Sequence, residues 1–145
     1  MSQVKRLTFL LFSLVFLIAS LCQIVSADEI SPRASDYLTG YGAYLYQGTV
    51  KGSVRVEFTV SATEHSDYVG VSELVIYKSN GSRAATITGT VSNGLLREDA
   101  GVHLGHYNYY GEPGVSYYAI LTMYAERDGG SDSRRYLTNT CTAPS

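Results

Sequence analysis

The clearest pattern in the sequence is a strict alternation of apolar and polar side chains over residues 53–63. The apolar positions are Val54, Val56, Phe58, Val60 and Ala62, and a polar residue occupies each position between them. Successive side chains of a β-strand point to opposite faces of a sheet, so this period of two predicts a strand that is buried on one face only.

Two more strands are predicted over residues 71–79 and 82–90, on either side of the dipeptide Asn80-Gly81. Asn-Gly readily takes the positive φ angles of a type I′ turn, which joins two strands through a loop of two residues. Such a turn fixes the register of the hairpin. The pairs expected on its core face are Leu74 with Ile87 and Ile76 with Ala85.

Four further segments complete the predicted set of about seven strands. They cover residues 41–47, 102–110, 115–127 and 134–142, and are linked by a connection over 93–101 and by turns over 112–114 and 128–133. No segment has a helical period. Short strands separated by Gly, Asn and Pro predict an all-β domain, a single two-sheet β-sandwich.

The first residues have the pattern of a signal peptide. Lys5 and Arg6 precede a mostly apolar run over residues 7–19, and Val25-Ser26-Ala27 offers the small final residue that a signal peptidase accepts. The run is short for a membrane span. We therefore predict a signal peptide over residues 1–27, a flexible lead-in over 28–35 and a β-sandwich domain over 36–145. The protein is expected to be secreted and extracellular, either free or associated with the cell wall, and to meet a membrane only through the signal peptide.

Charge and cysteine content narrow the range of functions. The chain has 11 basic and 13 acidic side chains, and two of the basic ones lie in the predicted signal peptide. A mildly acidic domain without a basic stripe argues against nucleic-acid binding. Cys141 is the only cysteine after that segment, so no internal disulfide is possible. We expect a buried small side chain at Cys141 rather than an intermolecular bridge, and a monomer.

Residues 112–125, with the sequence EPGVSYYAILTMYA, resemble the sixth strand of fibronectin type III and related immunoglobulin-like domains. In those domains a Pro-Gly turn precedes a tyrosine corner. The resemblance implies that Tyr117 is the corner tyrosine, and the inward side chains that it implies are Ala119, Leu121, Met123 and Ala125. The sequence departs from that motif at Gly111, where a leucine is usual, and it lacks the tryptophan of true immunoglobulin domains.

A second resemblance covers most of the chain after residue 27. The segments RASDYL (33–38), YYA (117–119) and GGSDSR (129–134) are similar to a family of small secreted proteins of unknown function from Gram-positive, largely gut-dwelling bacteria. This resemblance implies export and a bacterial source, and it implies no mechanism.

No catalytic, cofactor or metal site is predicted. The chain has three histidines, and no Gly-x-Ser-x-Gly nucleophile motif occurs. His103 and His106 are three residues apart, which on a strand directs them to opposite faces and disfavours a shared metal ion. Asp128 and Asp132 flank a glycine-rich turn and are expected to cap backbone N–H groups. The protein is therefore expected not to be an enzyme.

Tyrosine is the distinctive residue of the sequence, with 13 copies and no tryptophan. Tyrosines recur at positions 41, 44 and 46, and a surface aromatic patch is predicted from Tyr107, Tyr109, Tyr118 and Tyr124. Exposed aromatic patches bind sugars or proteins, although tyrosine also suits any half-exposed strand. The leading hypothesis is a non-enzymatic recognition domain for a protein or glycan. The alternatives are a secreted antagonistic, bacteriocin-like protein and, last, a small extracellular hydrolase.

Overall fold

The structure is a computed structural model, and it describes residues 35–145. The chain divides into two units, Met1–Ala34 and Ser35–Ser145, of which the second is the described one. The predicted signal peptide and residues 28–34 of the predicted lead-in lie outside the described residues. Within residues 35–145 there is no helix long and apolar enough to cross a membrane.

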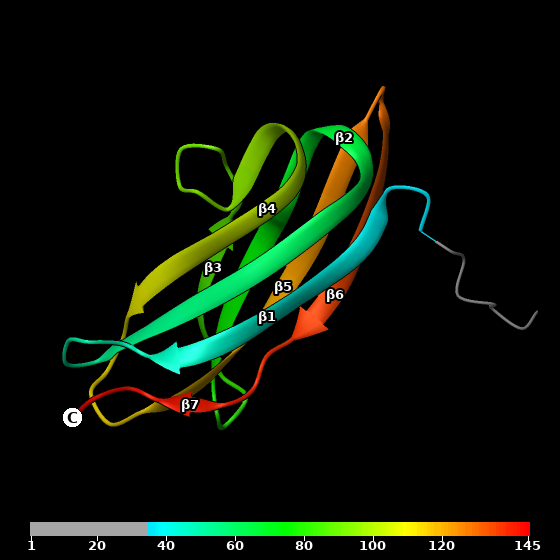
Figure 1. The fold of residues 1–145 in the computed structure, drawn as a ribbon. Helices are drawn as coiled ribbons and strands as arrows, with labels where there is room; N and C mark the ends of the chain where they lie inside the picture. Colours follow the sequence, from blue (N-terminus) through cyan, green and yellow to red (C-terminus); the bar gives the residue numbers. More distant parts are fainter. Residues whose placement is uncertain (1–34) are drawn as a thin grey trace, which may run out of the picture. The chain divides into compact units, whose positions relative to one another are not determined.

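The described unit is built from β-strands alone, which confirms the all-β prediction (Figure 1). All pairings are antiparallel, and together they form one sheet of seven strands. The strands are β1 (Leu38–Gln47), β2 (Ser53–Lys78), β3 (Arg83–Thr88), β4 (Leu96–Tyr110), β5 (Ser116–Arg127), β6 (Gly130–Leu137) and β7 (Cys141–Thr142).

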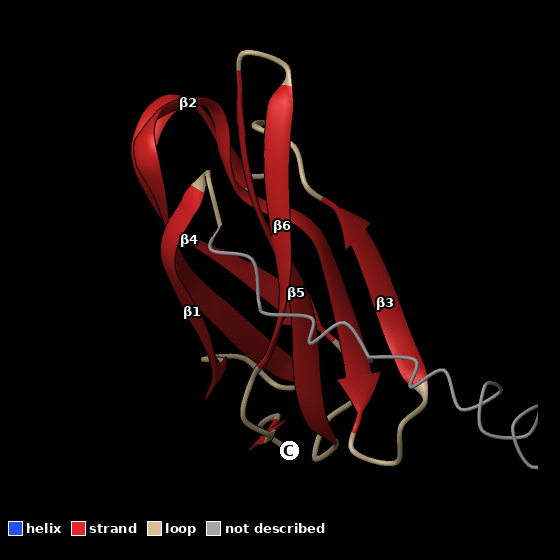
Figure 2. Ribbon diagram, turned by 90° about the vertical axis from the view of Figure 1, so that its right-hand side faces the viewer, coloured by secondary structure: helices blue, strands red, loops and turns tan. Residues whose placement is uncertain are grey.

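Strand β2 runs through 26 residues where the sequence predicted two separate strands. Its first half pairs with β1 and β4, its second half pairs with β3 and β5, and the pairing with β4 continues as far as Gly70. The strand bends between these halves, where its register with β4 shifts between Ser61 and Ser66 (Figure 2). The sheet therefore curls over on itself. The predicted division into two sheets is not confirmed, because β2 belongs to both ends of the curled sheet.

The core lies on the inner face of this curl. The predicted alternation is confirmed for Val54, Val56, Phe58 and Val60, which are buried while the polar residues between them are not, and the fifth apolar position, Ala62, is only half-buried. The inward side chains of β5 are also buried as expected: they are Ala119, Leu121, Met123 and Ala125. Burial of two opposing apolar faces is the main force that stabilises such a sheet.

The hairpin between β2 and β3 keeps the predicted register but has a different turn. The Lys78 N–H donates to the Ser82 carbonyl at 2.8 Å, and the Gly81 N–H donates to the Lys78 carbonyl at 2.9 Å. Gly81 alone has a positive φ, +86°, so the loop has three residues and is not a type I′ turn. A bulge beside the loop then restores the two predicted pairs, Leu74 with Ile87 and Ile76 with Ala85.

The two-residue type I′ turn occurs instead at Asp128-Gly129, whose φ angles are +52° and +78°. Strand β6 begins directly after it, so the longer turn predicted over 128–133 is wrong. The last predicted strand is also divided, because β6 ends at Leu137 and β7 holds only Cys141 and Thr142. In the same way β4 begins at Leu96, inside the connection predicted over 93–101.

Tyr117 is fully buried, and its hydroxyl accepts a hydrogen bond from the Glu112 N–H at 2.7 Å. This contact to the backbone just upstream is the one that a tyrosine corner makes. A Cβ atom at Gly111 would lie 2.4 Å from the Tyr117 hydroxyl oxygen. The glycine that departs from the immunoglobulin-like motif is therefore the residue that leaves space for the tyrosine.

Candidate functional site

Two of the four tyrosines of the predicted patch lie on the inner face of the sheet. Tyr107 and Tyr109 pair across the strands with the buried residues Val56 and Val54. Both rings are half-buried and pack against the core. The Tyr109 ring meets the buried Tyr117 ring edge-on, with the ring centroids 5.5 Å apart. These two tyrosines help to close the core of the domain.

The other two tyrosines lie on the outer face of β5. Tyr118 stacks on Tyr77 of β2, with ring centroids 5.2 Å apart and the planes within 9° of parallel. The Tyr124 hydroxyl donates to a carboxylate oxygen of Glu126 at 2.5 Å, and burial raises the pKa of Tyr124. The structure thus places two of the four tyrosines on each face of the sheet, and Tyr118 and Tyr124 contact different partners, so the four do not form one surface.

Aromatic and apolar side chains gather instead on the outer face of β1, β4 and the first half of β2, which we name the β1–β2–β4 face. Cross-strand pairing arranges its side chains in rows. The rows are Tyr46–Arg55–Asn108, Tyr44–Glu57–His106 and Gly42–Thr59–Leu104. Each strand contributes every second residue to this face, so its composition follows from the pairing register.

Tyr44 and Tyr46 form one side of this face. Both rings are about half exposed, at 51% and 45%, and their centroids lie 4.8 Å apart at an interplanar angle of 46°. Their neighbours Ala43 and Leu45 point inward, where Leu45 is buried. The alternation along β1 thus directs both phenol rings outward.

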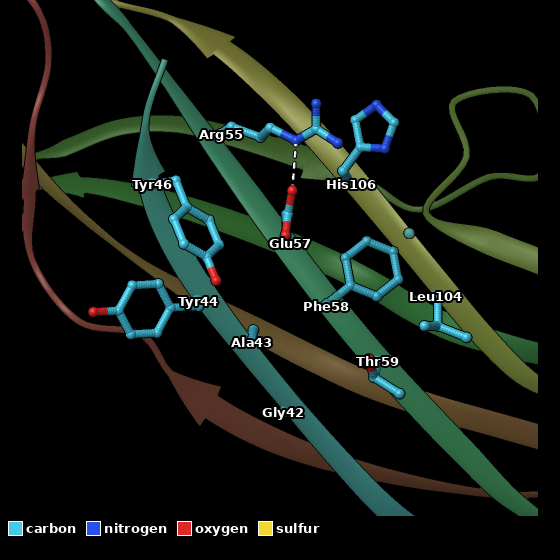
Figure 3. Close-up of a pocket in the computed structure, with 11 residues that line it drawn as sticks. Gly42, Ala43, Tyr44, Tyr46, Arg55, Glu57, Phe58, Thr59, Leu104 and His106 are labelled. Atoms are coloured by element: carbon cyan, nitrogen blue, oxygen red, sulfur yellow. Dashed lines mark ion pairs between the residues drawn. The ribbon is translucent and has the colours of Figure 1, made fainter. Parts of the chain in front are cut away.

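A groove of about 490 Å³ crosses the face beside these rings (Figure 3). The Arg55 Nε atom lies 2.9 Å from a carboxylate oxygen of Glu57, an ion pair that projects from β2 between the tyrosines of β1 and the side chains of β4. Gly42 leaves space at the lower end, because a Cβ atom there would meet nothing within 4 Å. A smaller hollow of about 150 Å³ adjoins the groove at Arg55 and is lined by Val50 and Tyr110, among others.

The face offers ring surfaces, a hydroxyl on each tyrosine, a guanidinium and a carboxylate. Such a set binds ligands that present both apolar patches and hydroxyl groups. Among residues 35–145, no group of three or more His, Cys, Asp or Glu side chains is placed to hold a metal ion. His103 and His106 lie on opposite faces of β4, as the spacing predicted: His103 contacts the buried Phe58, and His106 lines the groove.

Sequence reasoning noted Tyr44 and Tyr46 but did not assign them to the site. Their spacing of two residues shows that they share a strand face. β1 and β4 flank the same half of β2 because of pairings between residues far apart in the chain. No local sequence pattern shows that these two strands share a face.

No family model matches the chain, and no curated protein matches it. Among solved structures the chain is similar to a family 76 glycoside hydrolase from a bovine Bacteroides thetaiotaomicron strain, with a TM-score of 0.41 and 16% identity over 72% of this chain. The match spans 20% of that protein's chain.

Proposed function

We propose that the protein is a secreted, non-enzymatic recognition domain that binds a glycan chain through the β1–β2–β4 face. The observation that carries this proposal is the exposed Tyr44–Tyr46 pair beside the Arg55–Glu57 ion pair, along a groove on the sheet surface. Exposed aromatic rings that gather on one face of a small domain mark a binding surface.

The chemistry of the groove suits a sugar more closely than a purely apolar ligand. A tyrosine ring packs against the C–H groups on one face of a sugar ring, and its hydroxyl forms hydrogen bonds at the edge. The guanidinium of Arg55 donates hydrogen bonds and the carboxylate of Glu57 accepts them, so together they match the hydroxyl groups of a sugar. The adjoining hollow beyond Arg55 provides space for a further sugar unit of the glycan.

We also propose that the curled sheet is a β-sandwich of the immunoglobulin-like type in which one long strand, β2, runs through both layers. The hydrogen bond between Tyr117 and Glu112 supports it. The signal peptide predicted for residues 1–27 and the resemblance to small secreted proteins of Gram-positive bacteria support an extracellular role, free or at the cell wall.

The test is a glycan array that carries bacterial cell-wall glycans and host glycans, probed with labelled protein that comprises residues 28–145. We expect binding to one class of glycan, and calorimetry then gives its affinity. Replacing both rings, Tyr44→Ala with Tyr46→Ala, removes the stacking surface and is expected to weaken binding at least tenfold, about 1.4 kcal/mol.

The matched control is Tyr118→Ala, which removes a tyrosine from the outer face of β5 and is expected to keep the affinity of the unchanged protein. An array without any bound glycan would overturn the proposal. The proposal would also be overturned if the variant with Tyr44→Ala and Tyr46→Ala bound the glycan as tightly as the Tyr118→Ala control.

A further inference from the structure

Strand β4 has an open edge. It pairs with β2 along one side, and over Val102–Tyr110 no other strand of residues 35–145 pairs with its opposite side. Figure 1 shows β4 at the margin of the sheet. An open edge presents a row of unpaired N–H and C=O groups, which is a template for another strand.

Two other edges of the sheet carry features that oppose pairing with another strand. On β1, the side-chain amide of Asn139 takes the place of a strand: the Leu45 N–H donates to its oxygen at 2.8 Å, and its nitrogen donates to the Leu45 carbonyl at 2.9 Å. Strand β6 carries Asp132, Arg134 and Arg135, and charged side chains of this kind discourage edge-to-edge pairing.

The open edge of β4 has none of these protections. Residues 102–110 read VHLGHYNYY, a segment without lysine, arginine, aspartate, glutamate or proline. It also carries two of the most exposed apolar side chains of the described unit, Leu104 at 73% and Tyr110 at 69%. A long, neutral, apolar edge is what a strand-pairing interface requires.

We propose that this edge binds the same edge of a second copy of the protein, in antiparallel orientation, so that two sheets join into one. The Gly111 N–H donates to the Gly52 carbonyl at the end of the β2–β4 ladder. Gly111 and the odd-numbered residues of β4 therefore direct their N–H and C=O groups toward β2. Backbone groups of alternate residues point to opposite sides in an antiparallel ladder, so those of the even-numbered residues point toward the open side.

A second copy fits this edge because the strand is complementary to itself. With His106 opposite His106 of the second copy, Val102 lies opposite Tyr110 and Leu104 lies opposite Asn108. Val102 then meets the ring of Tyr110 at both ends, the two His106 side chains meet in the middle, Leu104 lies beside the uncharged Asn108, and no like-charged Lys, Arg, Asp or Glu pair arises. The arrangement has two-fold symmetry, so each copy satisfies the edge of the other and the assembly closes at two chains. This proposal does not rest on glycan binding.

The test is sedimentation of the purified protein over a range of concentrations, with the variant His106→Pro. The unchanged protein is expected to shift from one chain to two as its concentration rises. Proline removes an N–H that points to the open side and leaves the pairing with β2 intact, so it is tolerated at an edge. In the dimer it removes two symmetry-related hydrogen bonds, and we expect at least tenfold weaker association.

His106→Thr is the matched control, because it removes the imidazole but keeps the backbone N–H, and it is expected to dimerise like the unchanged protein. Circular dichroism establishes that each variant keeps its strands. A protein that remains a single chain at every concentration would overturn the proposal. This holds even if the edge binds an unrelated extended peptide. A folded His106→Pro variant that associates as tightly as the control would also overturn it.

Discussion

At the scale of single residues, one carboxylate ties the start of the described unit to β6. The Ser35 hydroxyl donates to an oxygen of Asp132 at 2.6 Å, and the Tyr37 N–H donates to the same oxygen at 3.1 Å. The hydrogen bond from Ser35 is the largest cause that lowers the pKa of Asp132, and the Tyr37 N–H adds to it, while burial acts in the opposite direction. The charged form of Asp132 is therefore favoured in the folded protein.

This lowered pKa predicts a loss of stability in acid. A carboxyl whose pKa is lower in the folded state stabilises the fold above its unfolded pKa, about 3.9, and the contribution disappears as the pH falls through the folded pKa. Urea unfolding of the protein and of Asp132→Asn at a series of pH values measures it. The difference in unfolding free energy between the two is expected to be constant above about pH 5 and to shrink below about pH 4.

A carbon NMR titration of Asp132 provides the direct control. Ser35→Ala removes the main cause of the shift, so the pKa of Asp132 is expected to move back toward its ordinary value. A difference in unfolding free energy that stays the same down to acid pH, or a pKa that Ser35→Ala leaves unchanged, would contradict this account.

At the scale of elements, the turn from β4 to β5 is shaped by the ring of Tyr117. A methyl group at Gly111 would lie 2.4 Å from the Tyr117 hydroxyl and 2.7 Å from the ring of Tyr109. We expect Gly111→Ala to destabilise the protein by about 1–3 kcal/mol, which is typical of overpacking in a closed site. Chemical denaturation measures the loss.

The control for this substitution is Gly42→Ala, because a Cβ atom at Gly42 meets nothing within 4 Å and the residue also lies in a strand. This variant is expected to be as stable as the unchanged protein or slightly more so, since glycine weakens a strand interior. Equal losses from the two substitutions would show that a general cost of replacing glycine, and not the ring of Tyr117, determines the stability.

The buried faces of the strands could be predicted from the sequence, whereas the continuity of the longest strand could not. Period-two burial is a local signal, and it correctly predicted the buried side chains Val54, Val56, Phe58 and Val60, while the resemblance to fibronectin type III domains supplied the inward residues of β5. The register of the hairpin at Asn80 was also predictable, because the apolar pairs fix it even though the turn differs. The continuity of β2 was not, since residues 64–70 carry no alternating pattern and are strand only because β4 and β5 pair with them.

The predicted aromatic patch was wrong for the same reason, because it depends on which strands pair and not on the local sequence alone. The outward direction of Tyr118 and Tyr124 follows from the pattern along β5, whereas the direction of Tyr107 and Tyr109 is set by their pairing with Val56 and Val54. That pairing joins residues about fifty positions apart. The sequence therefore shows which tyrosines share a strand but not which strands share a face.

At the scale of the whole molecule, the two ends of the curled sheet are joined by one strand, so we expect them to unfold together. Ile76→Val in the second half of β2 removes one buried methylene and is expected to cost about 0.5–1.5 kcal/mol. Hydrogen exchange measured by mass spectrometry is expected to report the same loss of protection in β1 and β4 as in β5. A loss confined to β3 and β5 would show that the two ends open independently.

The continuity of β2 also has a consequence for the order of events during synthesis. Four strands pair with β2, and three of them follow it in the chain. A ribosome that has just completed residue 78 has therefore made a long strand whose apolar face has met only β1, and the remaining partners emerge over the next fifty residues or so. At about 5–20 residues per second, this interval lasts several seconds. The nascent chain is most vulnerable to aggregation during that time, and substitutions in β5 that slow its docking would lower the yield of protein more than its final stability.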